Sequence, residues 1–121
     1  MAATHSRWAL GLAAAAALVV VAVTGGPARA GDPGRARALA DEALVAQAAG
    51  QHLDAVALLD AALVEYEHPK IRLLRARSLE SLGRGDEALA DYRSIDGDQR
   101  VVRFWDEIRT SIRALEAQLG M

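Results

Sequence analysis

The chain has 121 residues, with 14 basic and 16 acidic side chains, a net charge of −2 at pH 7 and no cysteine. This length allows one small domain. The acidic balance argues against nucleic-acid binding, which needs a concentrated basic surface. Because the absence of cysteine excludes disulfides, helix packing alone must stabilise the fold.

The first 30 residues have the pattern of an export signal. A short, weakly basic start leads into an apolar run over residues 8–23, and Ala28 and Ala30 supply the small-x-small pattern of a signal-peptidase site. The run is shorter than the roughly 20 residues that a membrane-spanning helix needs. We therefore expect removal of residues 1–30 and export to the periplasm or out of the cell. The alternative is an uncleaved anchor, formed by residues 8–23, in the inner membrane.

The next stretch predicts a helical hairpin. Asp32-Pro33 is typical of a helix start, with Asp as the N-cap and Pro in the first turn. We expect this helix to end at Gly50 and a second helix to follow over residues 54–66, where apolar residues recur three or four apart. Pro69 then forces a boundary, because the residue before a proline disfavours helix.

Three more helices are predicted after this boundary. The first covers residues 70–82, with its arginines mostly on the outside, and Gly83 closes it. The second covers residues 86–95, and the third runs unbroken over residues 99–119. The third carries one continuous apolar stripe of Val101, Trp105, Ile108, Ile112, Leu115 and Leu119. Without any strand-like alternation, the fold class is all-α.

Residues 49–55 and 82–88 are near copies of each other, 33 residues apart. Each copy has an apolar helix end, a glycine, polar turn residues, and then an acid and alanine that open the next helix. The copies pair Asp54 with Glu87 and Ala55 with Ala88. A period of this length, with two helices in each unit, is typical of helical solenoids.

These residues resemble the tetratricopeptide repeat family, over about residues 33–119. The first-helix pattern W-x2-L-G-x2-Y is present in degenerate form at Trp105, Ile108, Arg109 and Ile112, and the second-helix pattern A-x3-F is present as Ala55-x3-Leu59 and Ala88-x3-Tyr92. The period is one residue shorter than usual, and other helix-hairpin repeats remain an alternative. The resemblance implies a short α-solenoid over residues 31–121, capped by its C-terminal helix.

In this family the first helices of successive units line a concave groove that holds a peptide. Arg37, Lys70 and Arg103 recur at the 33-residue period, and Arg77 lies about two turns after Lys70. As a hypothesis, this row contacts acidic side chains or a C-terminal carboxylate of a partner. The alternative is that these residues are solvated charges paired with the plentiful acids.

The terminal stripe offers a different interaction surface. An exposed amphipathic helix can dock a second copy of itself, so that Trp105, Ile112, Leu115 and Leu119 would form a homodimer interface. The alternative is that Trp105 closes the core of the solenoid, because terminal repeats need covering.

No pattern in the sequence indicates catalysis, a cofactor or a metal. His52 and His68 lack ligand spacing, and no serine has a histidine and an acid nearby in sequence. We therefore expect a non-catalytic adaptor or scaffold of the bacterial envelope that binds a protein or peptide and contacts a membrane only if residues 1–30 are retained. The alternative function is self-assembly through the C-terminal helix.

Overall fold

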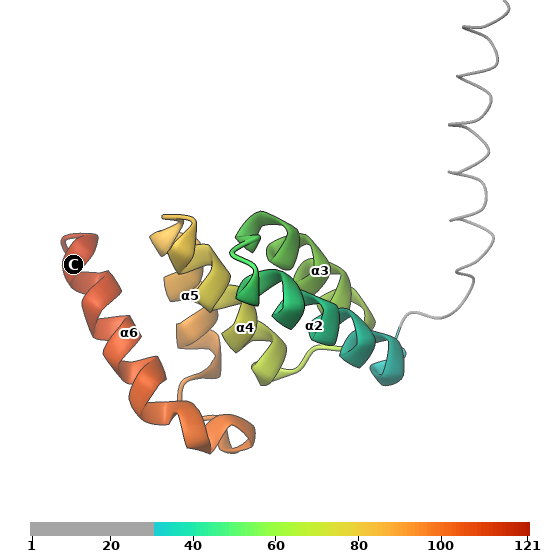
Figure 1. Cartoon of the computed structure of the whole chain (residues 1–121). Helices are drawn as coiled ribbons and strands as arrows, with labels where there is room; N and C mark the ends of the chain where they lie inside the picture. The colour runs from blue at the N-terminus through green and yellow to red at the C-terminus, as the bar shows by residue number, and fades with distance from the viewer. Residues whose placement is uncertain (1–30) are drawn as a thin grey trace, which may run out of the picture. The chain divides into compact units, whose positions relative to one another are not determined.

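The computed structural model describes residues 31–121, which form a unit of their own. The predicted cleavage site at Ala28 and Ala30 and the predicted anchor over residues 8–23 lie outside the described residues. The unit is all-helical, with α2 (Pro33–Ala48), α3 (His52–Glu65), α4 (Pro69–Ser81), α5 (Gly85–Ile95) and α6 (Trp105–Gln118), and a 3-10 helix η1 (Gln99–Phe104) precedes α6 (Figure 1). Residues 31–121 contain no strand, which confirms the all-α class.

Two hairpin turns, 33 residues apart, have the same backbone geometry. Gly50 and Gly83 each have a φ of 75°, a left-handed conformation that costs glycine little. In both turns the residue after the glycine donates its N–H to the carbonyl five residues earlier, at 2.8 and 2.9 Å (Gln51 to Ala46 and Arg84 to Leu79). This hydrogen bond satisfies a carbonyl at the helix end. Each turn folds its two helices back onto each other, α2 onto α3 and α4 onto α5.

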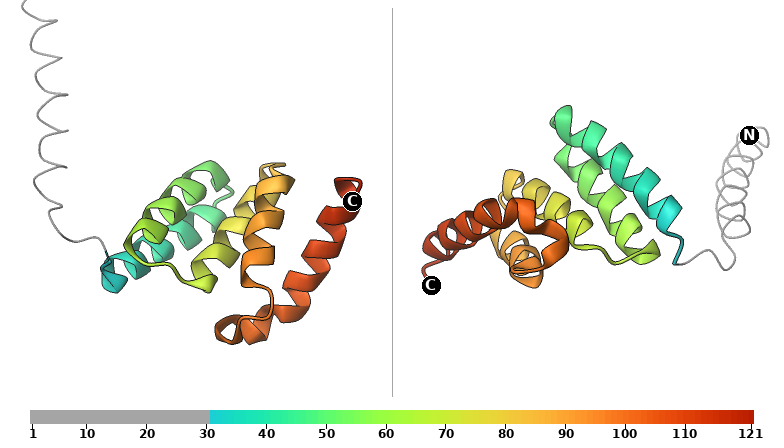
Figure 2. Two further views of the ribbon diagram at one scale, coloured as in Figure 1. Left: turned by 180° about the vertical axis from the view of Figure 1, so that it is seen from behind. Right: turned by 90° about the horizontal axis from the view of Figure 1, so that it is seen from below.

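The helices are stacked in chain order, and α4 is central. It packs against both α3 and α5, and α6 packs on the far side of α5 (Figures 1 and 2). Two groups of buried side chains follow from this order. One joins α2, α3 and the start of α4, and the other joins α4, α5, η1 and α6. The predicted inward face of α5 is confirmed, because Ala88, Leu89, Tyr92 and Ile95 are all buried.

The central place of α4 changes the predicted orientation of its arginines. Leu73 and Ala76 are buried in addition to the apolar residues expected to face inward. Arg72 and Arg75 are only 28% and 23% exposed and lie between neighbouring helices. The expectation that these arginines lie mostly outside is wrong, because a helix with neighbours on several sides has little free surface.

The prediction of one unbroken helix over residues 99–119 is wrong at its start. Residues 99–104 form η1, and Val101 leaves helical geometry with φ −122° and ψ 26°. Asp98 holds this segment at two points, since its carboxylate accepts from Arg100 N and its carbonyl accepts from Trp105 Nε1, both at 2.9 Å. This arrangement buries Val101 in the core. No helix within residues 31–121 has the length and apolar character needed to cross a membrane.

Candidate binding groove

A groove with a volume of about 470 Å³ runs between α2 and the first turns of α4. Its walls come from α2, from the loop that joins α3 to α4, and from α4 itself. The lining residues are Pro33, Ala36, Arg37, Ala40, Asp41, Leu44, Tyr66, His68, Lys70, Ile71 and Leu74. The groove therefore lies between the first helices of the two hairpins, where the family resemblance places a peptide.

The loop before α4 fixes one end of the groove. His68 is the N-cap of α4, and its Nδ1 accepts a hydrogen bond from the backbone N–H of Lys70 at 3.1 Å. The rings of Tyr66 and His68 are stacked, with their centroids 6.0 Å apart. Pro69 follows at the first helical position, where its missing N–H is not needed. These contacts set the direction in which α4 presents Lys70 and Ile71 to the groove.

The groove combines apolar walls with two free cations. Ile71 and Leu74 are buried, and Leu44 and Tyr66 are exposed at its rim. Within residues 31–121, no carboxylate lies within ion-pair distance of Arg37 or Lys70. An apolar segment with an acidic group fits this surface, because its carboxylate would meet a cation that has no partner within the domain.

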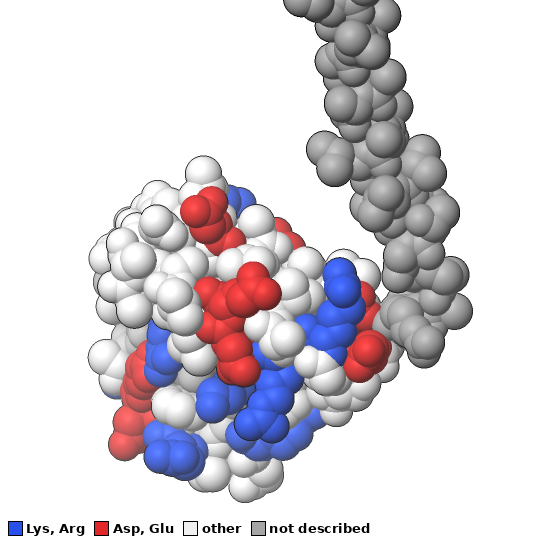
Figure 3. All heavy atoms as spheres, turned by 45° about the vertical axis from the view of Figure 1, so that its right-hand side comes forward, with Lys and Arg blue, Asp and Glu red and all other residues white. Residues whose placement is uncertain are grey.

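Two further groups set the charge of the groove. Asp41 contributes one carboxylate to the wall. The pKa of His68 lies below its ordinary value of 6.5, first because of burial and then because of the positive charge of Arg100, so its imidazole is neutral at pH 7. Arg37 and Lys70 therefore outweigh the single acid. On the face shown in Figure 3, basic side chains gather in one area with acidic ones beside it.

The other two residues of the predicted basic row lie elsewhere. Arg77 pairs with Glu107 of α6 through two hydrogen bonds of 2.7 and 2.6 Å, and its guanidinium lies 5.4 Å from the centre of the Phe104 ring. The hydrogen bond to Glu107 raises the pKa of Arg77. Arg103 is exposed on η1 and lies 6.0 Å from the same ring. The structure thus brings only Arg37 and Lys70 together in the groove, and Arg77 joins α4 to α6.

The stripe of α6 mostly covers the core. Leu115 is buried, and Trp105 and Ile112 pack partly buried against the same group of side chains. Leu119 is the most exposed of the four residues in the predicted dimer interface, at 45%. Most of the stripe is therefore used within the chain, as the core-closing interpretation expects.

A buried polar contact between the hairpins was not predicted from the sequence. Ser78 is fully buried, and its hydroxyl accepts from Gln47 Nε2 at 2.8 Å and lies 3.3 Å from His52 Nδ1. Gln47 also donates to the carbonyl of Leu74 at 2.7 Å. Because the Ser78 hydroxyl has no exposed surface, a substrate cannot reach it. The cluster holds the turn of the first hairpin against α4.

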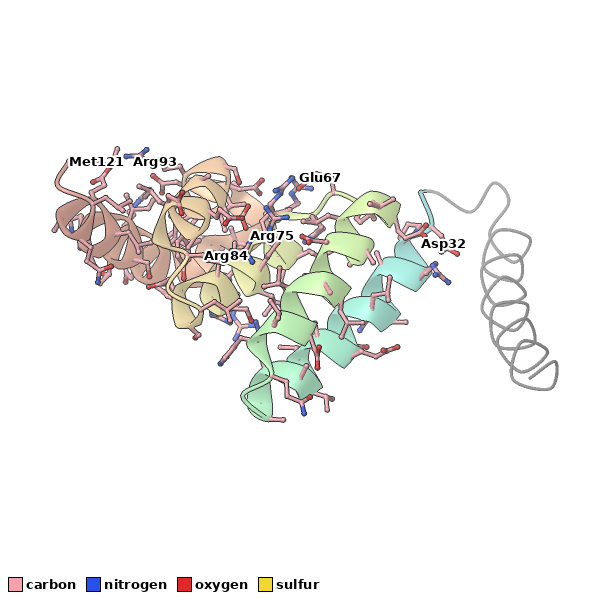
Figure 4. All side chains as sticks on the ribbon, turned by 90° about the horizontal axis from the view of Figure 1, so that it is seen from above. Asp32, Glu67, Arg75, Arg84, Arg93 and Met121 are labelled. Atoms are coloured by element: carbon pink, nitrogen blue, oxygen red, sulfur yellow. The ribbon has the colours of Figure 1, made fainter. Side chains whose placement is uncertain are left out.

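An ion cluster occupies the seam between α3 and α5, and Figure 4 shows Glu67 and Arg75 along it. Asp91 of α5 is 3% exposed and accepts from Arg72 at 3.1 Å and from Arg75 at 2.8 and 3.2 Å. Arg72 also bonds Glu67, and Arg75 also bonds Asp60. These arginines are fully engaged by carboxylates of the chain, so we interpret the cluster as structural.

Similarity to known proteins does not add to this picture. No protein-family model, curated protein or solved structure matches the chain. The tetratricopeptide resemblance therefore stays a prediction. Within residues 31–121, no group of three or more acids and histidines is placed to hold a metal ion. The groove between α2 and α4 remains the candidate site with free charged groups and apolar walls.

Proposed function

We propose that the chain is a non-catalytic adaptor of the bacterial envelope, built from tetratricopeptide-like helix pairs and capped by α6. Its groove between α2 and α4 binds an extended or helical segment of a partner protein. The observation that carries this proposal is the pair Arg37 and Lys70, which have no ion-pair partner within residues 31–121 and stand beside apolar walls.

The expected ligand is an apolar segment that carries an acidic side chain or ends in a carboxylate. Leu44 and Tyr66 expose apolar surface at the rim, and burying such surface contributes about 25 cal/mol for each Å² removed from water. The two cations select the acidic group, because a rival segment with a basic side chain would leave them unpaired and would repel them. Apolar contact supports the affinity of the complex, and charge supports its specificity.

Site-specific photo-cross-linking in intact cells tests this proposal. A photoreactive amino acid replaces Leu44 at the rim of the groove, and the control carries the same group in place of Ala114, which is exposed on α6. We expect one discrete cross-linked protein from position 44 that is absent from position 114. Identical products from both positions, or none from position 44 while the chain is folded and exported, would count against the groove.

A further inference from the structure

The first hairpin has an uncovered surface, here called the outer face, on the side of α2 and α3 that does not line the groove. Its exposed members are Ala38, Glu42, Val45, Ala49, Asp54 and Ala57. A shallow cavity of about 580 Å³ runs between the two helices here and is lined by four of them. Val45 is 72% exposed, although it is a branched apolar residue in the middle of the hairpin. The outer face is therefore largely apolar and small-sided, with two acids.

The residues 33 positions later in the chain are covered. Ile71, equivalent to Ala38, is buried in one cluster with side chains of α2 and α3. Ser78, equivalent to Val45, is fully buried under Gln47 and His52 of the first hairpin. The second hairpin thus has a helix pair stacked on the face that the first hairpin leaves open. Within residues 31–121 nothing stacks on the outer face in the same way.

Charge distinguishes the two stacking faces. Arg75 of α4 meets Asp60 of the overlying α3 at 2.7 Å. The equivalent residue of α2 is Glu42, so the charge at this position is reversed. Neither Glu42 nor Asp54 has a cation within ion-pair distance among the described residues. A helix that stacks on α2 as α3 stacks on α4 must carry a basic residue where α3 carries Asp60.

This requirement argues against a second copy that uses its α3, because Asp60 would then face Glu42. The required polarity already occurs at the other end of the stack, where Arg93 of α5 pairs with Glu116 of α6 at 2.7 Å. A cation on the covering helix and an acid on the covered helix are thus compatible with this type of packing.

We propose that the outer face docks an amphipathic helix of a partner protein, with apolar side chains against Ala38 and Val45 and with Lys or Arg side chains paired to Glu42 and Asp54. This surface is distinct from the groove, which selects acidic segments through Arg37 and Lys70. The chain would then hold two partners of opposite charge, or two segments of one partner.

The test uses two synthetic stapled helices of equal length with the same Leu and Ala face, one flanked by Lys and the other by Glu. Calorimetry on the full chain measures both affinities. Because the chain has no cysteine, Ala49→Cys gives a single site for an environment-sensitive fluorophore, and Arg113→Cys on α6 is the control site. We expect the Lys helix to change the signal at position 49 and leave position 113 unchanged.

The Lys helix should bind more tightly than the Glu helix by about two- to fivefold for each carboxylate engaged, the range for exposed ion pairs. Glu42→Lys should reverse part of this preference, and Glu42→Gln should reduce it, while circular dichroism confirms that both variants stay folded. The double variant Arg37→Glu, Lys70→Glu should leave the preference intact, so that failure of the groove proposal and failure of this one are distinguishable.

Equal affinity for the two helices, or a preference that Glu42→Lys does not change, would overturn the proposal. So would a fluorophore at position 49 that is already shielded in the free chain. Shielding that grows with protein concentration, together with a doubled mass in light scattering, would assign the face to a second copy. Shielding that disappears when residues 1–30 are removed would assign it to that segment.

Discussion

Replacing Asp91 by Asn is expected to be among the most destabilising polar changes in the chain. Asn keeps the size of the side chain but removes its negative charge and turns an amide N–H₂ toward a guanidinium. The carboxylate that it replaces is 3% exposed and accepts three hydrogen bonds from Arg72 and Arg75. Burial lowers the pKa of Arg75, but the hydrogen bonds and charges of Asp91 and Asp60 outweigh this effect and raise it.

The magnitude follows from what the arginines keep. Breaking a buried ion pair by removing one partner costs about 3–5 kcal/mol when the remaining charge is stranded. Here Arg72 and Arg75 are 28% and 23% exposed, and each retains a second carboxylate, from Glu67 and Asp60 respectively. Solvent and these acids screen the stranded charge. We therefore expect a loss of about 2–3 kcal/mol in the free energy of unfolding, or about 10–20 °C in Tm for a domain of this size.

Urea and thermal unfolding followed by circular dichroism at 222 nm measure this loss. The matched control is Asp60→Asn, because Asp60 bonds the same Arg75 at 2.7 Å but is 53% exposed. Its loss should stay below about 1 kcal/mol, as for exposed ion pairs. A free energy of unfolding for Asp91→Asn within about 0.5 kcal/mol of the natural chain would refute the reasoning, and so would equal losses for the two variants.

Three further changes test local features. Gly83→Ala should lower the free energy of unfolding in urea by about 1–2 kcal/mol, because an added Cβ meets nothing within 4 Å but alanine is strained at φ 75°. Trp105→Phe should cost about 0.5–1.5 kcal/mol in the same assay, because it removes the hydrogen bond to the Asp98 carbonyl. The pKa of His68 is lowered in the folded chain, so its contribution to stability should be complete above pH about 6.5 and decline as the pH falls through the folded value. Hydrogen exchange at the Lys70 amide, which His68 caps, should speed up over the same pH range.

Each of these expectations has a clear contrary result. An unchanged urea midpoint for Gly83→Ala would mean that the turn does not need a left-handed residue. A stability loss in Trp105→Phe that is already present in a variant lacking the indole ring only at its N–H, such as one with a benzothienyl analogue, assigns the loss to the hydrogen bond; no loss in that variant contradicts it. A His68 pKa at or above its ordinary value in an NMR titration would reverse the sign of the pH dependence.

The local features that the sequence predicted are those that a short stretch of chain encodes by itself. The turns at Gly50 and Gly83 could be predicted because a left-handed glycine at a helix end has few rival conformations. The first helix start at Asp32 is another example, since its carboxylate accepts from Gly34 N at 2.9 Å. The inward face of α5 followed from its apolar spacing.

The features that sequence reasoning missed depend on residues far apart in the chain. Arg77 was predicted in the basic row, but its partner Glu107 comes from 30 residues later. The break at Val101 follows from the contact between Trp105 and the Asp98 carbonyl, which helical periodicity does not register. The buried place of Arg75 could not be foreseen until α3 and α5 were both packed on α4.

The candidate groove was predicted in part. The 33-residue spacing of Arg37 and Lys70 indicated that the two lie near each other, and both line the groove. Arg103 has the same spacing, but it lies on η1, where the third unit departs from a regular helix. Tyr66 and His68 were not predicted as wall residues, because they belong to a loop whose direction depends on the packing of α3 against α4.

The central claim is that Arg37 and Lys70 hold a partner in the groove. The most direct test is cross-linked affinity capture from the envelope fraction with the natural chain, with the folded double variant Arg37→Glu, Lys70→Glu, and with the control Arg113→Glu, which reverses an exposed charge on α6. We predict a specific protein that the natural chain and the control capture and the double variant loses. Equal capture by all three chains, or recovery of the chain itself alone, would contradict the claim.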